Sequence, residues 1–428
     1  MLLAQPLFYF KHLLKIWPNS YLAEDGEQII IGIDCDYLSG DNLNDFKAKL
    51  NECTKAFNES ADLKFAWFAG LFGVLSYEAV YSFEKLGDIK PTLYKMPMYC
   101  YAKARAYLYY DKQSKLYECL GDEKYFKELE ILKDESLNDL SKQNDVFCEI
   151  LSDLDAQKAH FTAIIEKAKE YIKSGDIFQV VLSNTLHLYS NLDPLVFYEC
   201  LKKQNPSHYM YYYPTPFGII AGSSPELVMK IKADEIFVSP IAGTRARGVD
   251  ANDDERLANE LLHDEKELAE HKMLVDLARN DVGKFALGGS VRVKNLMHIE
   301  RFESVMHIVS DVLAKKDSAF DNFDVLSVVF PAGTLSGSPK IRAMQIINEL
   351  ETHARGIYGG GIGFWHFNGD MQMAILIRSA MFIERKNAYD VYIGAGAGIV
   401  YDSNANAEYA EICNKRKSCQ KIFTHFAK

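Results

Sequence analysis

The 428-residue sequence predicts an α+β fold whose sheets are mainly antiparallel. β-rich segments come in adjacent groups, as at 227–231 and 235–238, where only a short turn separates two runs. Helical segments lie between these groups and do not alternate regularly with single strands. Regular alternation would indicate a parallel sheet, so the grouped strands favour antiparallel pairing.

Residues 1–145 predict a first structural unit. Short β-rich runs, such as 28–33 and 96–110, alternate there with polar segments. The charged stretch 124–145 has little periodicity after Leu132, which predicts a helix leading into a linker. We therefore expect one unit over residues 1–145 and a second over 146–428.

The second unit opens with a helical pattern over 156–173. Its apolar residues recur at helical spacing, and Ser174-Gly175 is a typical end signal because glycine tolerates the left-handed cap. Pro339 predicts the first position of another helix, where its missing N–H costs nothing. We expect strands at 178–183, 373–383 and 389–400, apolar runs at 305–313 and 325–330, and helices at 253–281, 339–351 and 405–427.

Charge and cysteine usage exclude several classes of protein. The net charge is −11, from 48 basic and 59 acidic residues, which argues against non-specific binding to nucleic acid or to a membrane surface. The eight cysteines form no C-x-x-C pair and indicate reduced cytoplasmic thiols. Pro6, Lys11 and Lys15 interrupt the apolar start, so it is not a signal peptide, and no stretch is long enough to span a bilayer. We expect a cytoplasmic protein.

Three glycine-rich motifs fail as nucleotide-binding sites. The run 394–398 would need a third glycine at Ile399, and 359–363 fails the same spacing. The segment 333–340 has two residues between Gly337 and Lys340 and no Ser or Thr after the lysine, unlike a P-loop. A nucleotide-binding enzyme is therefore disfavoured.

Two pairs of glutamates stand on predicted helices. Glu267/Glu270 and Glu408/Glu411 are each spaced three apart, so each pair shares one helix face. Two such faces suit one Mg²⁺ ion, which binds few carboxylates and keeps waters or substrate oxygens. The alternative is a solvated acidic face, the commoner use of such pairs.

Three single residues each have a structural and a functional interpretation. Gln179 lies in an apolar run, where it either hydrogen-bonds in a core or lines a pocket. Glu226 follows the turn Ser223-Ser224-Pro225, which is either a surface turn or a loop that carries chemistry. His307, within an apolar run, is either a satisfied core residue or a catalyst.

Arg378 and the alternating glycines of 393–400 also leave two interpretations open. A guanidinium inside the apolar run 374–382 needs an anion, either an internal carboxylate or a carboxylate of a substrate. Glycines in a strand mark close approach of a ligand or tight packing against another element. An approaching carboxylate would meet backbone N–H donors there.

These segments, taken together and in order, resemble the chorismate-utilising enzymes, and among them the large subunits of anthranilate synthases. The resemblance is dense over 155–428 and limited to 20–25 in the first 145 residues. The matching segments are 175–183, 205–213, 222–228, 240–248, 264–283, 305–312, 330–344, 358–364, 374–380, 393–400 and 408–415.

The resemblance implies two stacked antiparallel sheets flanked by helices, with a regulatory-type N-terminal subdomain and a chorismate-binding catalytic domain. It implies Mg²⁺ held by Glu270 and Glu411, with Glu267 and Glu408 acting through waters. It also implies a general acid at Glu226, which must start protonated. The remaining implied roles are help near the pyruvyl group from His307, substrate positioning by Thr334, and binding of substrate carboxylates by Tyr358, Arg378, Gly394, Gly396 and Gly398.

Two positions select a branch of this family. Water-using relatives carry a lysine where this sequence has Gln179, and a lysine base is unnecessary when ammonia is the nucleophile. Aminodeoxychorismate synthases typically carry a lysine where this sequence has Ala242. The sequence thus favours conversion of chorismate and ammonia to anthranilate and pyruvate, a lyase reaction. The alternatives are an aminodeoxychorismate synthase subunit and a non-catalytic protein, which would have lost carboxylates or Arg378.

The resemblance also raises the questions of an inhibitor and a partner. A tryptophan inhibitor would contact Asp25, Asn205, Pro206, Tyr209 and Met210. The family's L-L-E-S is here Leu22-Ala23-Glu24-Asp25 and His208 replaces a proline, so inhibition by tryptophan stays open. Gln372 also replaces an aspartate that the family usually carries before the arginine segment, and the sequence assigns no consequence to this change. No G-x-C-x-G segment is present, and we expect a separate glutamine amidotransferase subunit to supply ammonia.

Overall fold

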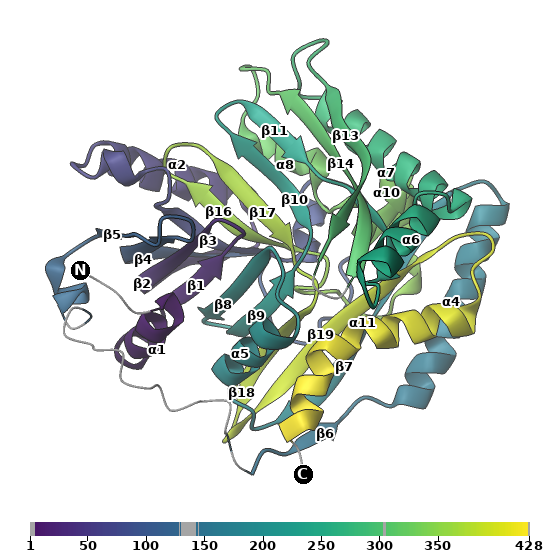
Figure 1. Cartoon of the computed structure of the whole chain (residues 1–428), viewed down its shortest axis with the longest axis horizontal. Helices are drawn as coiled ribbons and strands as arrows, with labels where there is room; N and C mark the ends of the chain where they lie inside the picture. The colour runs from purple at the N-terminus through teal and green to yellow at the C-terminus, as the bar shows by residue number, and fades with distance from the viewer. Residues whose placement is uncertain (1–4, 128, 130–142, 144, 303–304, 427–428) are drawn as a thin grey trace.

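The computed structural model describes residues 5–127, 129, 143, 145–302 and 305–426 (Figure 1). The helices are α1 (Pro6–Ile16), α2 (Leu43–Asn58), α4 (Leu154–Lys173), α5 (Pro194–Gln204), α6 (Ala251–Leu261), α7 (Glu265–Gly283), α8 (Asn322–Val329), α9 (Gly333–Ser336), α10 (Lys340–Leu350) and α11 (Ala405–Phe426). The strands are β1 (Tyr21–Glu24), β2 (Gln28–Gly40), β3 (Gly70–Leu75), β4 (Tyr99–Asp111), β5 (Tyr117–Leu120), β6 (Cys148–Ile150), β7 (Gln179–Ser190), β8 (Tyr209–Thr215), β9 (Gly218–Ser224), β10 (Leu227–Lys232), β11 (Glu235–Val238), β12 (Ile241–Ala246), β13 (Arg292–Arg301), β14 (Val305–Lys315), β15 (Gly337–Ser338), β16 (Gly361–His366), β17 (Met371–Ile375), β18 (Ser379–Arg385) and β19 (Ala388–Ile399).

Antiparallel pairing joins these strands into one network with two arms that meet at β4. One arm runs from β4 through β2, β1, β8, β9, β18 and β19 to β7. The other runs through β3, β16, β17, β10 and β11 to β14. The predicted α+β class with antiparallel sheets and flanking helices is confirmed, and the two arms correspond to the two sheets that the sequence implied.

Aromatic side chains fill the space between the two arms. Tyr21 of β1 stacks on Phe72 of β3 with ring centroids 4.6 Å apart. Tyr213 of β8 meets the same Phe72 ring edge-on at 5.3 Å. Buried rings of this size contribute much of the hydrophobic stabilisation of a domain, so the central core lies where the arms face each other.

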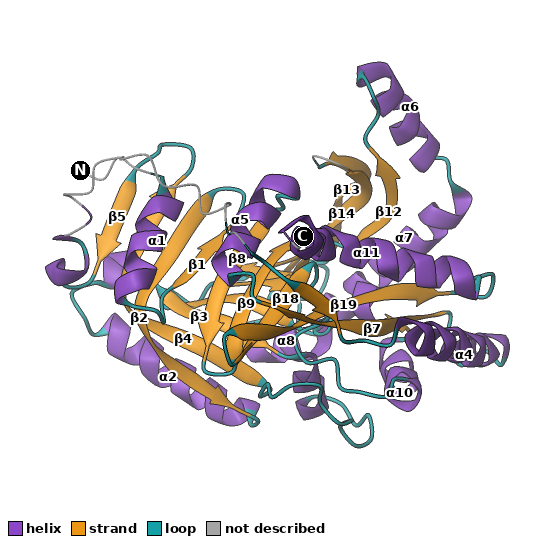
Figure 2. Cartoon of the chain, turned by 90° about the horizontal axis from the view of Figure 1, so that it is seen from below, coloured by secondary structure: helices purple, strands orange, loops and turns teal. Residues whose placement is uncertain are grey.

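The outer faces are covered by helices, and the alternation along β2 shows how. Ile29, Ile31 and Ile33 point to the cluster under α1, whereas Ile30 belongs to the central core, to which α2 contributes. Opposite faces of one strand are thus covered by different layers. At the other end of the molecule, α4, α10 and α11 lie around β7 and β19 (Figure 2).

Strands from both predicted units pair with each other. β1 pairs with β8, and β3 pairs with β16. The division at residue 145 stays a prediction, and most of the helix expected over 124–145 lies outside the described residues.

Two predicted elements are wrong in their continuity. The helix expected over 253–281 is two helices, because Asp264 caps a new start at α7 by accepting hydrogen bonds from the backbone N–H groups of Lys266 and Glu267. The strand expected over 373–383 is interrupted between Ile375 and Ser379. In addition, the apolar run 325–330 falls mainly in α8, and α10 begins at Lys340 with Pro339 as its N-cap.

Two further features of the fold concern membrane-spanning helices and disulfides. Across the described residues, no helix combines the length and the apolar composition that crossing a bilayer demands. None of the eight cysteines, all of which the structure describes, forms a disulfide.

Candidate active site

Glu226 and Thr334 meet in a cavity between the end of β9 and α9. Thr334 Oγ1 donates a hydrogen bond to Glu226 Oε2 at 3.1 Å, across 108 residues of sequence. The cavity wall also contains Leu274 and Ile375. Burial raises the pKa of Glu226, while Arg378 and the Thr334 hydroxyl pull it back in part. An enclosed carboxyl with a raised pKa is suited to giving up a proton.

Arg378 sits in the break between β17 and β18. Its φ is +49°, and its carbonyl accepts a hydrogen bond from Ser223 N at 3.2 Å, which ties the break to the turn before Glu226. Burial lowers the pKa of its guanidinium, and Glu226 is the main group that opposes this shift. No carboxylate of the described residues lies within ion-pair distance of the guanidinium. It is therefore available to an incoming anion.

His307 lies on β14 opposite Thr244 of β12. Its Nδ1 is 2.8 Å from the Gly243 carbonyl and 3.1 Å from Thr244 Oγ1. A carbonyl only accepts, so Nδ1 carries the proton and Nε2 keeps its lone pair. Burial lowers the pKa of His307, which favours the neutral ring. Ala242, in the same strand β12, is buried opposite Ile308.

The glycines of β19 are in contact with two other candidate residues. A Cβ added to Gly394 would lie 2.6 Å from Tyr358 Cβ, and one at Gly396 would lie 2.6 Å from Tyr358 Oη. A Cβ at Gly398 would lie 2.5 Å from Gln179 Nε2. Tight packing against neighbours, one of the two interpretations, is what the structure has.

The same strand has an unpaired edge. β18 pairs with β19 only as far as Tyr392, and from Ile393 onward the described strands pair with β19 only on the β7 side. This edge can offer backbone groups to a ligand, so the second interpretation remains compatible with the first.

On α7, Glu267 and Glu270 lie beside each other as the spacing predicted. Burial and the Glu270 carboxylate raise the pKa of Glu267. Gln179 Nε2 donates to Glu270 Oε1 at 2.8 Å. Gln179 Oε1 is buried without a protein partner. Gln179 is therefore buried and hydrogen-bonded, as the core interpretation expects, and its second polar atom leaves the pocket interpretation open.

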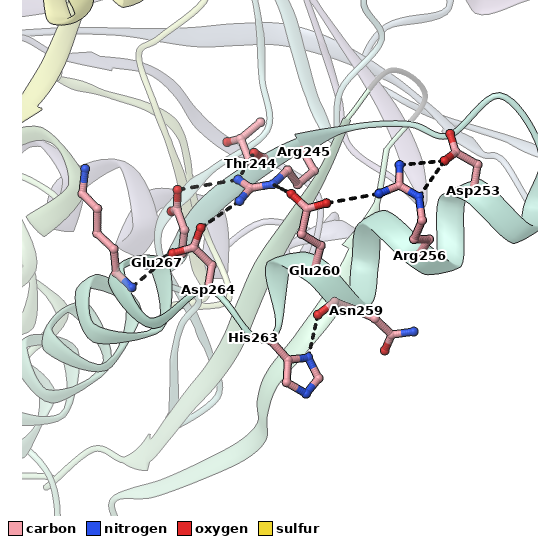
Figure 3. Close-up of polar contacts among 10 residues, drawn as sticks. Thr244, Arg245, Asp253, Arg256, Asn259, Glu260, His263, Asp264 and Glu267 are labelled. Carbon is pink, nitrogen blue, oxygen red and sulfur yellow. Dashed lines mark hydrogen bonds and ion pairs between the residues drawn. The ribbon is translucent and has the colours of Figure 1, made fainter.

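Arg245 of β12 holds the start of α7 in place (Figure 3). Its guanidinium is 2.8 Å from Asp264, 3.3 Å from Glu260 and 3.8 Å from Glu267. Glu260 also forms an ion pair of 3.3 Å with Arg256, and both of these residues lie on α6. This exposed network fixes the corner between α6 and α7, and with it the position of Glu267.

On α11, Glu408 and Glu411 form the second pair. Burial and the Glu411 carboxylate raise the pKa of Glu408, although Ser403 Oγ donates to it at 2.7 Å. Lys415 Nζ lies 2.7 Å from Glu411 Oε1 and donates to the Gly396 carbonyl at 2.9 Å. α11 is thereby fastened to the glycine strand.

The four carboxylates fit a hard cation by their chemistry. Each helix brings two of them side by side, and burial together with the neighbouring carboxylate raises the pKa values of Glu267 and Glu408, a cost that a cation would relieve. Among the described residues, no three acidic, His or Cys side chains gather closely enough to enclose a metal alone. Mg²⁺ does not need such a cage, because it usually takes one or two carboxylates and completes its shell with waters and substrate oxygens.

A second cavity lies between the arms, beside the start of β2. Asp25, Tyr209 and Met210 line it together with Gln372. Gln372 Nε2 lies 3.4 Å from Asp25 Oδ2. Asn205 ends α5 and accepts from Ser223 through its carbonyl, and neither it nor Pro206 lines this cavity. Three of the five residues expected for an inhibitor thus come together.

Sequence reasoning missed a buried charged pair behind the site. Arg355 and Glu351 are 4% and 7% exposed and form an ion pair of 2.6 Å. Their i,i+4 spacing was a signal, but it straddles the end of α10 at Leu350. Lys340 and Asp281 form a second buried pair at 2.5 Å.

The chain matches known proteins over nearly all of its length. The family model of chorismate binding enzymes covers residues 18–421. Anthranilate synthase component 1 of Aquifex aeolicus (strain VF5) is 40% identical over 391 residues, 87% of this chain and 78% of that protein. Anthranilate synthase component 1 of Saccharolobus solfataricus is 40% identical over 373 residues, 83% of this chain and 82% of that protein.

Solved structures agree with the family match. Anthranilate synthase component I from Streptococcus pneumoniae superimposes with a TM-score of 0.76 at 31% identity, over 97% of both chains. The menaquinone-specific isochorismate synthase from Escherichia coli has the same fold, with a TM-score of 0.74 at 18% identity over 98% of this chain and 91% of that chain. The resemblance seen in the sequence is confirmed, and the chain belongs to the family of chorismate-binding enzymes.

Proposed function

We propose that the chain is the chorismate-converting component of an anthranilate synthase and makes anthranilate and pyruvate from chorismate and ammonia, in tryptophan biosynthesis. The names of the relatives at 40% identity support this activity. The observation that carries it is the enclosed Glu226 carboxyl, with its raised pKa, between the Thr334 hydroxyl and the charge of Arg378. This arrangement suits a dicarboxylate substrate that must lose a hydroxyl group.

In the first step, ammonia adds to the ring beside its carboxylate while the ring hydroxyl leaves. The C–O bond breaks as the C–N bond forms, and Glu226 gives its proton to the departing oxygen, which leaves as water. Arg378 and the edge of β19 bind the substrate carboxylates. Tyr358 and Thr334 set the orientation, because both are held by packing or hydrogen bonds in the structure.

In the second step, the enolpyruvyl ether is eliminated. Its bond to the ring breaks, the ring carbon that bears nitrogen loses a proton, and the departing enol takes up a proton at its methylene carbon to become pyruvate. His307 has a free Nε2 lone pair for a proton in this step. Its Nδ1–H bond to Gly243 keeps the ring in the required tautomer.

Glu270 and Glu411 would hold Mg²⁺, with Glu267 and Glu408 acting through waters. When bound, the cation would neutralise the ring carboxylate of the substrate. Glu270 and Glu411 each have one oxygen engaged, by Gln179 and by Lys415, which leaves each a second oxygen for a ligand.

Gln179 and Ala242 support anthranilate as the product. Gln179 is buried against Glu270 and offers no base for water. Ala242 brings no lysine to the site. The alternative product, aminodeoxychorismate, has the amino group para to the ring carboxylate.

A glutamine amidotransferase subunit would supply the ammonia, because the chain lacks a nucleophile elbow of its own. The word "component" in the names of the relatives agrees with a second subunit. Eight cysteines without a disulfide among them agree with a reducing, cytoplasmic location.

The test is a fluorescence assay on the purified chain with chorismate, Mg²⁺ and ammonium at alkaline pH. Anthranilate fluorescence that EDTA abolishes and excess Mg²⁺ restores is the expected result. Consumption of chorismate without fluorescence would select the aminodeoxychorismate alternative. A folded chain that consumes no chorismate would contradict the proposal.

Glu226→Gln is the matched variant for this assay. Glutamine can still accept the hydrogen bond from Thr334 but cannot give up a proton. We expect kcat to fall by about 10²- to 10⁴-fold, the usual contribution of a general acid, with an unchanged melting temperature.

A further inference from the structure

We propose that Arg355 is a positioning residue that sets the relative places of three substrate-site segments, those that carry Gln179, Thr334 and Tyr358. The inference rests on the proposed function of the site. It starts from a permanently charged side chain that is only 4% exposed and does not itself line the cavity at Glu226.

The donors of the Arg355 guanidinium reach three different elements. Nε and Nη2 bind the two oxygens of Glu351 at 2.9 and 2.6 Å. Nη2 also donates to the Val181 carbonyl of β7 at 2.7 Å. Nη1 donates to the Leu335 carbonyl of α9 at 2.8 Å. One rigid, planar group therefore connects β7 with α9, which lysine could not do.

Each of these bonds ends next to a site residue. Leu335 directly follows Thr334, the donor to Glu226. Val181 lies two residues after Gln179 on β7, and Glu351 adds a second tie to this strand by accepting from Ser183 N and Oγ at 2.8 and 3.0 Å. The β7 segment and the α9 segment are thus both hydrogen-bonded to the Arg355 guanidinium.

The third segment is the loop that carries Tyr358. Tyr358 N donates to the Arg355 carbonyl at 3.2 Å, and the guanidinium lies 5.9 Å from the Tyr358 ring centroid. The guanidinium also lies 4.6 Å from the ring of Tyr77. Glu78 accepts from the backbone N–H groups of Arg355 and Gly356 at 2.8 and 3.1 Å, so the loop is fixed from both ends.

Stability alone is a weak reason for such an arrangement. A buried ion pair is often no more stabilising than apolar residues of the same volume, because both charges lose their hydration. What the pair does provide is directional bonding at defined distances. Removing it should therefore change the geometry at Glu226, through α9 and Thr334, more than it changes substrate binding.

The test is Arg355→Lys, which keeps the charge but has one nitrogen for three elements. We expect kcat for chorismate to fall about 10- to 100-fold, the scale of a small misplacement of reacting groups. The alkaline limb of the kcat profile, measured at constant free ammonia, should also move to higher pH. The reason is that a displaced Thr334 no longer stabilises the Glu226 carboxylate, and the acid form persists longer.

Thr334→Val should move the limb in the same direction, and the double variant should move it no further, because both act on one hydrogen bond. Arg342→Lys is the control. Arg342 lies on α10 and forms only partly exposed pairs with Asp176 and Glu349, and its variant should keep the wild-type profile.

A folded Arg355→Lys variant with the wild-type limb would overturn the inference and leave Arg355 a structural role. If that variant does not fold, Ser183→Ala replaces it. This variant removes one donor to Glu351 and keeps the ion pair, and it should move the limb in the same direction. An unmoved limb would then decide against the inference. A wild-type chain without chorismate turnover would instead refute the proposed function.

Discussion

Gly394 and Tyr358 are in direct contact: a Cβ on Gly394 would lie 2.6 Å from both Cβ and Cγ of Tyr358. The ring of Tyr358 is buried and fixed by its neighbours, so it cannot move aside. The glycines of β19 thus make room for residues that would orient a substrate.

Gly394→Ala should therefore be destabilising. We expect a loss of about 1–3 kcal/mol, as for overpacking in a tight core, together with lower turnover of chorismate. Unfolding in urea would measure the loss. Gly288→Ala is the control, since nothing lies within 4 Å of the added methyl group. Equal midpoints for the two variants would show that the strand has more room than the contact indicates.

Glu78 predicts a pH dependence of stability near neutrality. Burial raises its pKa from 4.5 to about 7. The folded state thus binds this proton more tightly than the unfolded state. The stability it contributes is complete below pH 4.5 and is lost as the pH rises through 7.

Glu78→Gln keeps one acceptor oxygen where the carboxylate offers one to each backbone donor, and it removes the titration. Relative to wild type, it should gain up to about 3 kcal/mol between pH 5 and pH 8, the value of such a shift. Urea midpoints across this range measure the effect. The exposed Glu59→Gln variant should show the same change of urea midpoint with pH as the wild type. The idea fails if Glu78→Gln shows that change too.

Lys340 and Asp281 provide a test of buried charge. Lys340 Nζ also donates to the Val328 and Val329 carbonyls at 2.8 and 3.1 Å. Lys340→Met would leave the Asp281 carboxylate buried and alone, at a cost of about 3–5 kcal/mol.

The double variant Lys340→Met/Asp281→Leu should recover much of that loss, because no uncompensated charge remains. Exposed Lys417→Met should change the free energy of unfolding by less than about 0.5 kcal/mol. If Lys340→Met were as stable as the double variant, the Asp281 carboxylate would be stabilised by water or by other groups when Lys340 is absent.

Mg²⁺ should raise the melting temperature of the chain without any substrate. A cation that binds only the folded state stabilises it by about 2.7 kcal/mol at one hundred times its dissociation constant. Glu270→Gln and Glu411→Gln should each reduce this shift. Asp276→Asn, an exposed position on α7, should not. A shift that survives in the paired Glu270→Gln/Glu411→Gln variant would place the cation elsewhere.

Local patterns in the sequence predicted much of the molecule. The helices over 156–173 and 405–427 follow from apolar spacing and appear within one or two residues of the predicted bounds. The pairing of Glu267 with Glu270 and of Glu408 with Glu411 follows from helical geometry. The antiparallel class follows from the grouping of strands. These features depend on neighbours three or four residues apart, which is the range a sequence pattern reports.

Only the tertiary structure decided the rest. The break at Arg378 lies inside the apolar segment 374–382, where no turn signal marks it, and the Arg378 carbonyl there accepts a hydrogen bond from the distant turn at Ser223. The bond between Thr334 and Glu226 spans 108 residues, and the three partners of the Arg355 guanidinium, Val181, Leu335 and Glu351, meet only in the folded chain. Burial and pairing of charges are properties of distant segments brought together, and residue order alone does not fix their distances.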